Sequence, residues 1–335
     1  MSEGRAEERR GEAVTGRTGE QITGDKSAPQ EITGRRGSLA PADKVVVAYL
    51  TIITALILIF RYRIEVWPWL CAAHAIGVGF VVLVSFLDRT DSSVAACPRP
   101  LTQSPSLRLA SFLHGWYPVA MITLCFKDLS YLIPRIHPRD FDAALAAIDY
   151  RAFGAHPTVW LERFMWPPLT ELLQICYPTY YLLPIILGAV IWRSRDREGF
   201  RFWVFVVVYG FYLSYLGYIA VPAIGPRLLL EILEAQTKPL SGLMFFQTVR
   251  DALDRAEGLT RDCFPSGHTE MTLLALYYAR QFHRKTFLIF LPLGVAIIVS
   301  TVYLRYHYVV DVAAGALLAG AVILSAPKVF SALER

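Results

Sequence analysis

Charged residues are scarce in this sequence, and their scarcity excludes an ordinary soluble domain. Asp, Glu, Lys and Arg make up 18% of the 335 residues, whereas 54% are hydrophobic, and the mean hydropathy is +0.40. Soluble domains carry about 25% charged residues. The net charge of +5 comes from scattered basic residues that cluster only near the ends of apolar runs, so we expect no nucleic-acid partner. The composition indicates an integral membrane protein.

Cysteine is also infrequent. Three of the five cysteines lie inside apolar runs, and none has the spacing of a metal-binding motif. We therefore expect neither a disulfide framework nor a zinc site. The five are Cys71, Cys97, Cys125, Cys176 and Cys263.

Long apolar segments are abundant. Six uncharged runs come close to the roughly 20 residues that a helix needs to cross a bilayer. Two weaker segments contain charges: residues 267–282 include Glu270 and Arg280, and residues 307–327 include Asp311. Polar groups inside a membrane bundle are usually kept for function, so we count both segments and predict an all-α, polytopic bundle of eight membrane helices. The six stronger runs are residues 45–60, 66–87, 109–126, 172–192, 202–222 and 286–304.

The first 44 residues differ from the rest of the chain because they are polar and rich in Gly, Arg and Glu. Such a segment cannot bury a core, so we expect a disordered tail. Because it precedes the first apolar run, we interpret residues 45–60 as a retained helix rather than a cleaved signal peptide.

Lys and Arg in short loops predict the orientation of membrane helices. Residues 193–201 contain four arginines, and residues 280–285 contain three basic residues. This pattern places both loops and both termini in the cytoplasm, with residues 127–170 and 223–266 outside. Arg61 and Arg63 lie in the first outer turn and oppose this orientation.

Two segments place a histidine at the mouth of an apolar run: PSGH at residues 265–268 and RYHYVVD at residues 305–311. His307 and Asp311 are four residues apart, so on a helix they share one face. The carboxylate can accept the proton of one imidazole nitrogen and leave the other as a directed lone pair. His268, on another helix, can protonate a leaving oxygen. This set predicts phosphoryl transfer through a histidine; the alternative is an incidental histidine beside a structural His–Asp pair.

Further residues near these histidines predict a phosphate-binding site. Ser266 can cap the helix that follows it, and the helix N-terminus, with the amide of Gly267, offers N–H groups and partial positive charge to a phosphate. Arg227 follows a Gly and a Pro that fix its loop, and a guanidinium suits bidentate phosphate binding. Arg305 lies two residues before His307. The alternative for each arginine is an interfacial side chain that reaches toward the lipid head groups.

These residues resemble the signatures of the type 2 phosphatidic acid phosphatase superfamily, which is related to the vanadium haloperoxidases. Residues 265–268 match the PSGH of the second signature without substitution, and His307 with Asp311 match the third. Two cations differ. Ala220 stands where the first signature has Lys, and Thr301 stands where the third usually has Arg. The pairing of GPR with STVYLRYHYVVD resembles the inositol phosphorylceramide synthase branch and its bacterial relatives, and favours a phosphodiester or phosphotransfer substrate.

The resemblance implies a role for each of these residues. His307 is the nucleophile that forms a phosphohistidine, Asp311 orients it, and His268 protonates the departing alcohol and then activates water or an acceptor hydroxyl. The enzyme would need no metal and no cofactor. The groups implied to hold the phosphate oxygens are Arg227, Arg305, Ser266 and the amide of Gly267.

The resemblance also implies a domain organisation and a location. Residues 109–327 would be a six-helix, phosphatase-type catalytic core, preceded by two extra membrane helices in residues 45–108. Residues 1–44 and 328–335 would be cytoplasmic tails. The expected location is a bacterial inner (plasma) membrane, with the active site on the extracytoplasmic face.

Three alternatives to this lipid phosphatase or phosphotransferase stay open. The enzyme can be a polyprenyl pyrophosphate phosphatase, which is a variant of the same reading. It can instead be a non-catalytic carrier or binding protein for an anionic lipid. It can also be a haem or metal protein ligated by His268 and His307. The expected partners are the bilayer and a lipid phosphate, and the sequence does not predict the oligomeric state.

Overall fold

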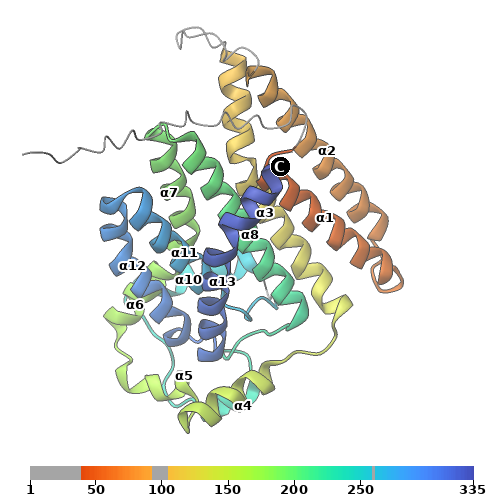
Figure 1. Cartoon of the computed structure of the whole chain (residues 1–335). Helices are drawn as coiled ribbons and strands as arrows, with labels where there is room; N and C mark the ends of the chain where they lie inside the picture. The colour runs from red at the N-terminus through yellow and green to blue at the C-terminus, as the bar shows by residue number, and fades with distance from the viewer. Residues whose placement is uncertain (1–38, 93–104, 259–260) are drawn as a thin grey trace, which may run out of the picture. The chain divides into compact units, whose positions relative to one another are not determined.

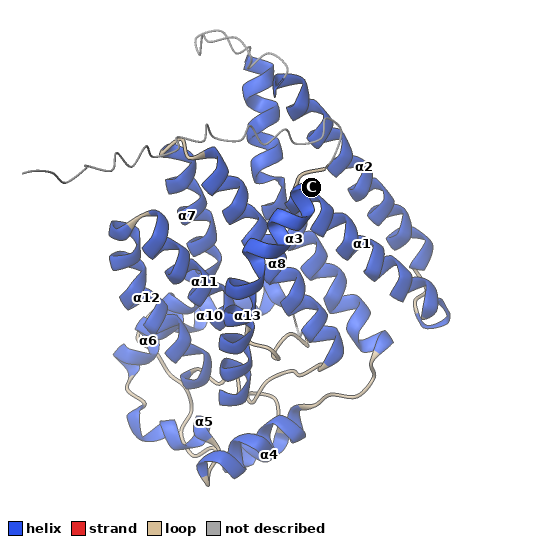
Figure 2. Cartoon of the chain, in the orientation of Figure 1, coloured by secondary structure: helices blue, strands red, loops and turns tan. Residues whose placement is uncertain are grey.

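A computed structural model of the chain describes residues 39–92, 105–258 and 261–335. Every regular element in these residues is a helix (Figures 1 and 2). Nearly all of the predicted disordered tail, residues 1–38, lies outside the described residues. Its last residues do not belong to a tail, because the first helix begins at Pro41 rather than at residue 45.

Within these described ranges, seven helical segments are long and apolar enough to cross a membrane. One of them is built from two helices, α6 and α7, joined by the short 3₁₀ segment η3. The prediction of an all-α, polytopic membrane bundle is confirmed. The segments are α1 (Pro41–Ile59), α2 (Trp67–Ser92), α3 (Pro105–Ile136), α6 (Pro167–Cys176) with η3 (Tyr177–Tyr181) and α7 (Leu182–Arg193), α8 (Arg197–Ala220), α12 (Arg284–Tyr303) and α13 (Val309–Glu334).

The segment predicted as the eighth membrane helix has the predicted bounds, but it is not among the segments that are long and apolar enough to cross a membrane. Helix α11 (Gly267–Phe282) has 16 residues, a length of about 24 Å, whereas the hydrocarbon core is about 30 Å thick. Its polar residues Thr269, Glu270 and Thr272 are fully buried inside the protein. A helix enclosed by other helices can carry polar groups that lipid would not tolerate, which explains its low hydropathy. The described residues therefore contain seven apolar spans and one short helix that packs against α7, α8, α12 and α13.

Glycines let neighbouring helices approach α11 closely. A side chain at Gly315 of α13 would overlap the backbone carbonyl oxygen of Ser266, and a Cβ at Gly294 of α12 would lie 2.9 Å from side-chain atoms of Leu276 and Thr272. Small residues at such crossings bring helix backbones together.

We expect Gly315→Ala to destabilise the bundle by about 1–3 kcal/mol, because the added methyl group meets a backbone atom that cannot rotate away. Thermal unfolding in detergent measures the change. The matched control is Gly320→Ala on the same helix, where a Cβ would have no neighbour within 4 Å. Equal unfolding temperatures for the two variants would contradict the tight crossing.

Short helices form in the segments between α3 and α6 and between α8 and α11. Figure 1 shows α4 and α5 at the end of the bundle where α8 ends and where α13 begins. The bounds of the short helices are α4 (Asp142–Phe153), α5 (Pro157–Trp160), η2 (Leu161–Phe164), α9 (Leu230–Ala235) and α10 (Phe246–Glu257); η1 (Arg61–Arg63) joins α1 and α2.

The start of α1 and the end of α13 meet at the opposite end of the bundle. Lys44 Nζ donates a hydrogen bond to the carbonyl oxygen of Leu333. The two basic loops lie here as well, because Arg201 of the first loop forms an ion pair with Glu334 at the end of α13, at 3.1 Å. Phe282, at the start of the second loop, packs against Gly199. The basic loops and the two helix ends therefore share one end of the bundle.

Buried polar contacts join the first three helices. His114 of α3 places Nδ1 2.7 Å from Asp88 of α2 and Nε2 3.0 Å from Asp43 of α1. His74 of α2 lies 3.2 Å from Asp128 of α3. These ion pairs tie α1, α2 and α3 to one another.

Candidate active site

The start of α11 fixes the position of His268. The Oγ of Ser266 accepts a hydrogen bond from the backbone N–H of Thr269, at 3.3 Å, so Ser266 caps the helix as predicted. The N–H of Ser266 donates to the carbonyl oxygen of Asp311, at 3.1 Å, and ties α11 to α13. A Cβ at Gly267 would overlap Oη of Tyr218. Ser266 and Gly267 are buried behind the pocket rather than among the residues that line it.

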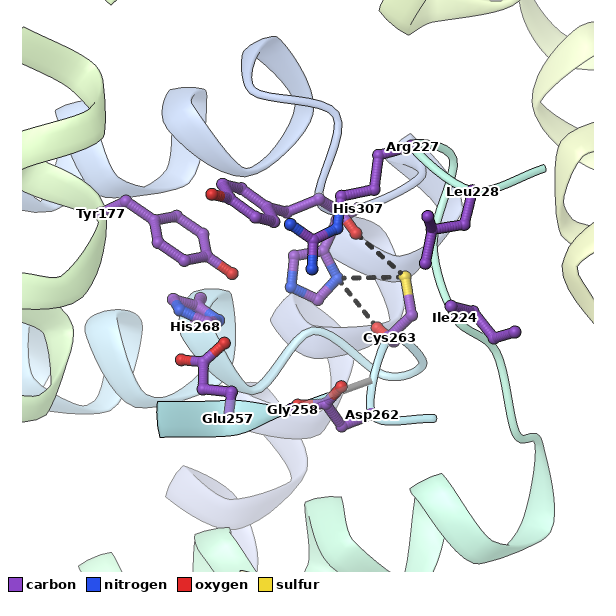
Figure 3. Close-up of a pocket in the computed structure, with 11 residues that line it drawn as sticks. Tyr177, Ile224, Arg227, Leu228, Glu257, Gly258, Asp262, Cys263, His268 and His307 are labelled. Atoms are coloured by element: carbon purple, nitrogen blue, oxygen red, sulfur yellow. Dashed lines mark hydrogen bonds between the residues drawn. The ribbon is translucent and has the colours of Figure 1, made fainter. Parts of the chain in front are cut away.

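His307 is held through one ring nitrogen. Its Nδ1 lies 2.9 Å from the carbonyl oxygen of Cys263 and 3.5 Å from Oδ2 of Asp311. The sequence predicted Asp311 as the partner, but the backbone carbonyl is the closer acceptor. A hydrogen bond to a carbonyl requires a proton on Nδ1, so Nε2 carries the lone pair. Figure 3 shows Nε2 on the side of the ring that faces His268 and Tyr177.

Asp311 organises the groups around His307. Its Oδ2 accepts hydrogen bonds from the thiol of Cys263 and from the backbone N–H of Tyr308, both at 2.8 Å. The second of these bonds anchors the first turn of α13. Asp311 therefore positions His307 both directly and through Cys263.

Cys263, His307 and Asp311 also bring possible metal ligands within 4.8 Å of one another. A metal ion at these atoms would displace the protons of the thiol and of Nδ1. Burial and the neighbouring Asp311 raise the pKa of the Cys263 thiol well above its ordinary value. The contacts favour a hydrogen-bonded cluster over a metal site.

His268 lies between two aromatic rings. Its ring centroid is 4.1 Å from that of Tyr177, 3.7 Å from that of Tyr180 and 5.6 Å from that of His307. Its Nε2 is buried and has no hydrogen-bond partner among the described residues. Both tyrosines come from η3, and a 3₁₀ segment inside a membrane span often marks a functional position. The available sequence signal was Pro178, which interrupts the apolar run.

Arg227 lines the same pocket as the two histidines. Its guanidinium lies over the ring of Tyr306, 4.9 Å from the centroid, and forms an ion pair with Asp254 at 2.7 Å. Its backbone N–H donates to the carbonyl oxygen of Arg305, at 3.1 Å. The close approach requires Gly225, since a Cβ there would lie 2.6 Å from the carbonyl oxygen of Tyr306. The structure thus brings Arg227, His268 and His307 together.

Arg305 does not line this pocket. Its guanidinium is buried and forms an ion pair with Glu162 at 2.7 Å, with further hydrogen bonds to Gln236 Oε1 at 2.6 Å and to the carbonyl oxygen of Lys238 at 2.8 Å. These contacts join the segment between α3 and α6 to the segment between α8 and α11. They favour a structural role for Arg305 over the predicted contact with phosphate.

Carboxylates of α4 hold the loops that carry the site. Asp142 accepts hydrogen bonds from the backbone N–H groups of Ile224 and Gly225, at 2.9 and 2.8 Å, and from Oη of Tyr308 at 3.0 Å. Asp149 accepts two bonds from the backbone at the start of α13. Sequence reasoning missed both residues, because a carboxylate that binds backbone N–H groups has no partner pattern in the sequence.

We expect Asp142→Asn to lower stability by about 2 kcal/mol, because an amide oxygen replaces a carboxylate that accepts three hydrogen bonds. The looser Arg227 loop should also lower kcat/KM. Thermal unfolding and phosphate release measure the two effects. Asp251→Asn, at an exposed position on α10, is the control. An Asp142 variant as stable and active as this control would contradict the role of Asp142.

Comparison with known families identifies the chain. Residues 143–325, more than half of the sequence, match the PAP2 superfamily. The chain belongs to the PAP2 superfamily. The match confirms the superfamily predicted from the two histidine motifs. The matched range includes every residue of the pocket and leaves α1, α2 and α3 outside.

One curated relative gives the same assignment with less coverage. A PA-phosphatase related-family protein of Dictyostelium discoideum is 24% identical over 160 residues, which cover 42% of this chain and 29% of the relative. The PAP2 chain thus spans less than a third of the length of that relative. No solved structure matches.

Proposed function

We propose that this protein is a lipid phosphatase or phosphotransferase that acts through a phosphohistidine on a lipid-linked phosphate or phosphodiester. One observation carries the proposal. A single pocket is lined by His307, His268 and Arg227. His307 holds its proton on Nδ1, and the buried Nε2 of His268 has no hydrogen-bond partner among the described residues. A nucleophile, a proton donor and a cation for the phosphate oxygens are the groups that such a transfer requires.

In the first step, Nε2 of His307 attacks the phosphorus atom. An N–P bond forms while the bond between phosphorus and the leaving oxygen breaks. The leaving oxygen takes the proton of protonated His268 and departs as an alcohol. The Nδ1–H bond to the Cys263 carbonyl and the nearby Asp311 carboxylate stabilise the positive charge of the phosphorylated ring.

In the second step, neutral His268 takes a proton from water or from an acceptor hydroxyl. The oxygen attacks phosphorus, the N–P bond breaks, and His307 returns to its starting state with its lone pair on Nε2. Water gives hydrolysis, and an acceptor alcohol gives transfer of the phosphoryl or phosphatidyl group. His268 ends the step protonated, ready for the next turnover.

Arg227 is the side chain that we assign to the phosphate oxygens during both steps. We assign the amides at the start of α11, including that of Gly267, a supporting electrostatic role, because a helix N-terminus carries partial positive charge. Ser266 would act through its cap of that helix, and Arg305 through the segments that it joins.

We further propose that the pocket faces the extracytoplasmic side. The basic loops at residues 193–201 and 280–285 lie at the end of the bundle opposite to α4, the start of α11 and the pocket. Basic loops stay in the cytoplasm, so the pocket would open on the other side, as in an inositol phosphorylceramide synthase-like enzyme.

Turnover of a lipid panel tests the function. Detergent-purified protein is incubated with phosphatidic acid, polyprenyl pyrophosphate or phosphatidylinositol, with and without EDTA and with and without a ceramide acceptor. We expect release or transfer from one lipid that persists in EDTA, and an acid-labile, base-stable phosphoenzyme after rapid quenching. Binding of these lipids without any turnover would show that the protein is a lipid-binding protein and not an enzyme. If phosphate is released from polyprenyl pyrophosphate and from no other lipid of the panel, the protein is a polyprenyl pyrophosphate phosphatase.

A further inference from the structure

The pocket carries two carboxylates as well as its histidines and Arg227. Glu257, the last residue of α10, and Asp262, just before the PSGH turn, both line it. Figure 3 shows both carboxylates on the side of the two histidines that is away from Arg227. A site built only to hold phosphate would not place two anions beside its nucleophile.

Positive charge in the pocket is limited. Arg227 shares its charge with Asp254, 2.7 Å away, and Arg305 is paired with Glu162 outside the pocket. Ala220 and Thr301 occupy two positions where the superfamily signatures have a cation. A phosphomonoester with two negative charges would meet one shared cation and two carboxylates, whereas a phosphodiester carries a single negative charge.

Glu257 is held in place and can change its charge near neutral pH. The Oη of Tyr181 donates a hydrogen bond to Oε1 of Glu257, at 2.7 Å, and leaves Oε2 as an acceptor. Burial, together with the charges of Asp262 and Asp254, raises the pKa of Glu257 to about 7 against the opposing effects of Tyr181 and Arg227. The carboxyl group is therefore mostly neutral below that pH and mostly ionised above it.

We infer that Glu257 is a specificity-determining residue: its carboxylate selects a singly charged phosphodiester whose head group or acceptor offers hydroxyl donors, and it disfavours a doubly charged phosphomonoester. The inference rests on the proposed function, and it deepens that function by naming the substrate class. Oε2 of Glu257 accepts a hydrogen bond from a hydroxyl group of the ligand, while His307 and Arg227 contact the phosphate of the ligand.

The test compares wild type with Glu257→Gln, which keeps an acceptor for Tyr181 and removes the charge. The ratio of kcat/KM for short-chain phosphatidylinositol to that for short-chain phosphatidic acid is measured at about pH 6 and about pH 8. We expect the variant to lower this ratio about tenfold at the higher pH and much less at the lower pH, where the wild-type carboxyl group is already mostly neutral. Substrate ionisation cancels, because both proteins act on the same substrates.

Two further variants sharpen the result. Glu231→Gln changes an exposed carboxylate of α9 that does not line the pocket, and it should leave the ratio unchanged. Tyr181→Phe removes the hydrogen bond that favours the ionised form, so the pH at which the ratio changes should move upward. It keeps the inference testable if Glu257→Gln does not fold.

An unchanged ratio and an unchanged pH dependence in Glu257→Gln would overturn the inference while leaving the phosphohistidine enzyme intact. Turnover of neither lipid by wild type would instead overturn the proposed function.

Discussion

Replacing His307 by asparagine should abolish turnover, with a loss on the order of 10⁴-fold or more. Asparagine can still donate a hydrogen bond to the Cys263 carbonyl that now holds Nδ1 of His307, so the surrounding loop is kept. It has no nitrogen lone pair that can attack phosphorus, and no N–P bond can form. The measurement is the rate of phosphate or head-group release from the lipid that wild type uses best, together with the yield of phosphoenzyme.

The control is His137→Asn, which makes the same substitution at a histidine that lies in the segment after α3 and does not line the pocket. It should keep wild-type activity. Lipid binding by His307→Asn should stay within a few-fold of wild type, because Arg227 is unchanged. Activity that falls only in proportion to binding would identify His307 as a binding residue and remove the phosphohistidine from the mechanism.

The membrane helices that face lipid could be predicted from the sequence. Apolar runs of about 20 residues marked the lipid-facing helices. The predicted bounds of the uncharged runs lie within about five residues of the observed ones, except that α3 continues from the predicted end at residue 126 to Ile136. Helix α11 was the difficult case, because it packs against α8, α12 and α13 and buries Glu270. Hydropathy measures the fitness of a segment for lipid, so it underestimates a helix that is surrounded by protein.

The site was predictable only in part, for a related reason. PSGH and the His–Asp spacing are local patterns, and the structure brings their histidine rings to 5.6 Å. Arg305 carried the same local signal as Arg227, but its partner Glu162 lies 143 positions away. Spacing along the chain cannot report such a pairing. The carboxylates of Asp142 and Asp149 were missed for the same reason, since their partners are backbone N–H groups of distant loops.

His268→Asn should lower kcat for the lipid substrate by about 10²- to 10⁴-fold, the usual contribution of a positioned acid or base. The expected result differs for a phosphodiester with a p-nitrophenol leaving group. Nitrophenolate leaves without a proton, so His307 can still form the N–P bond. Hydrolysis of that bond needs the base that the variant lacks, and the phosphoenzyme should therefore accumulate after one burst of nitrophenolate.

This comparison separates the two histidines that share the pocket. His307→Asn should lose activity toward both substrates and show no burst of nitrophenolate. His268→Asn should lose activity toward the lipid and keep the burst. His268 stacks on Tyr177 and Tyr180, so thermal unfolding must show that the variant keeps its fold. A folded His268→Asn protein that loses both substrates to the same extent would mean that His268 holds the ligand rather than transferring its proton. The Nε2 of His268 would then be a binding group, and another residue of the pocket would have to supply the acid.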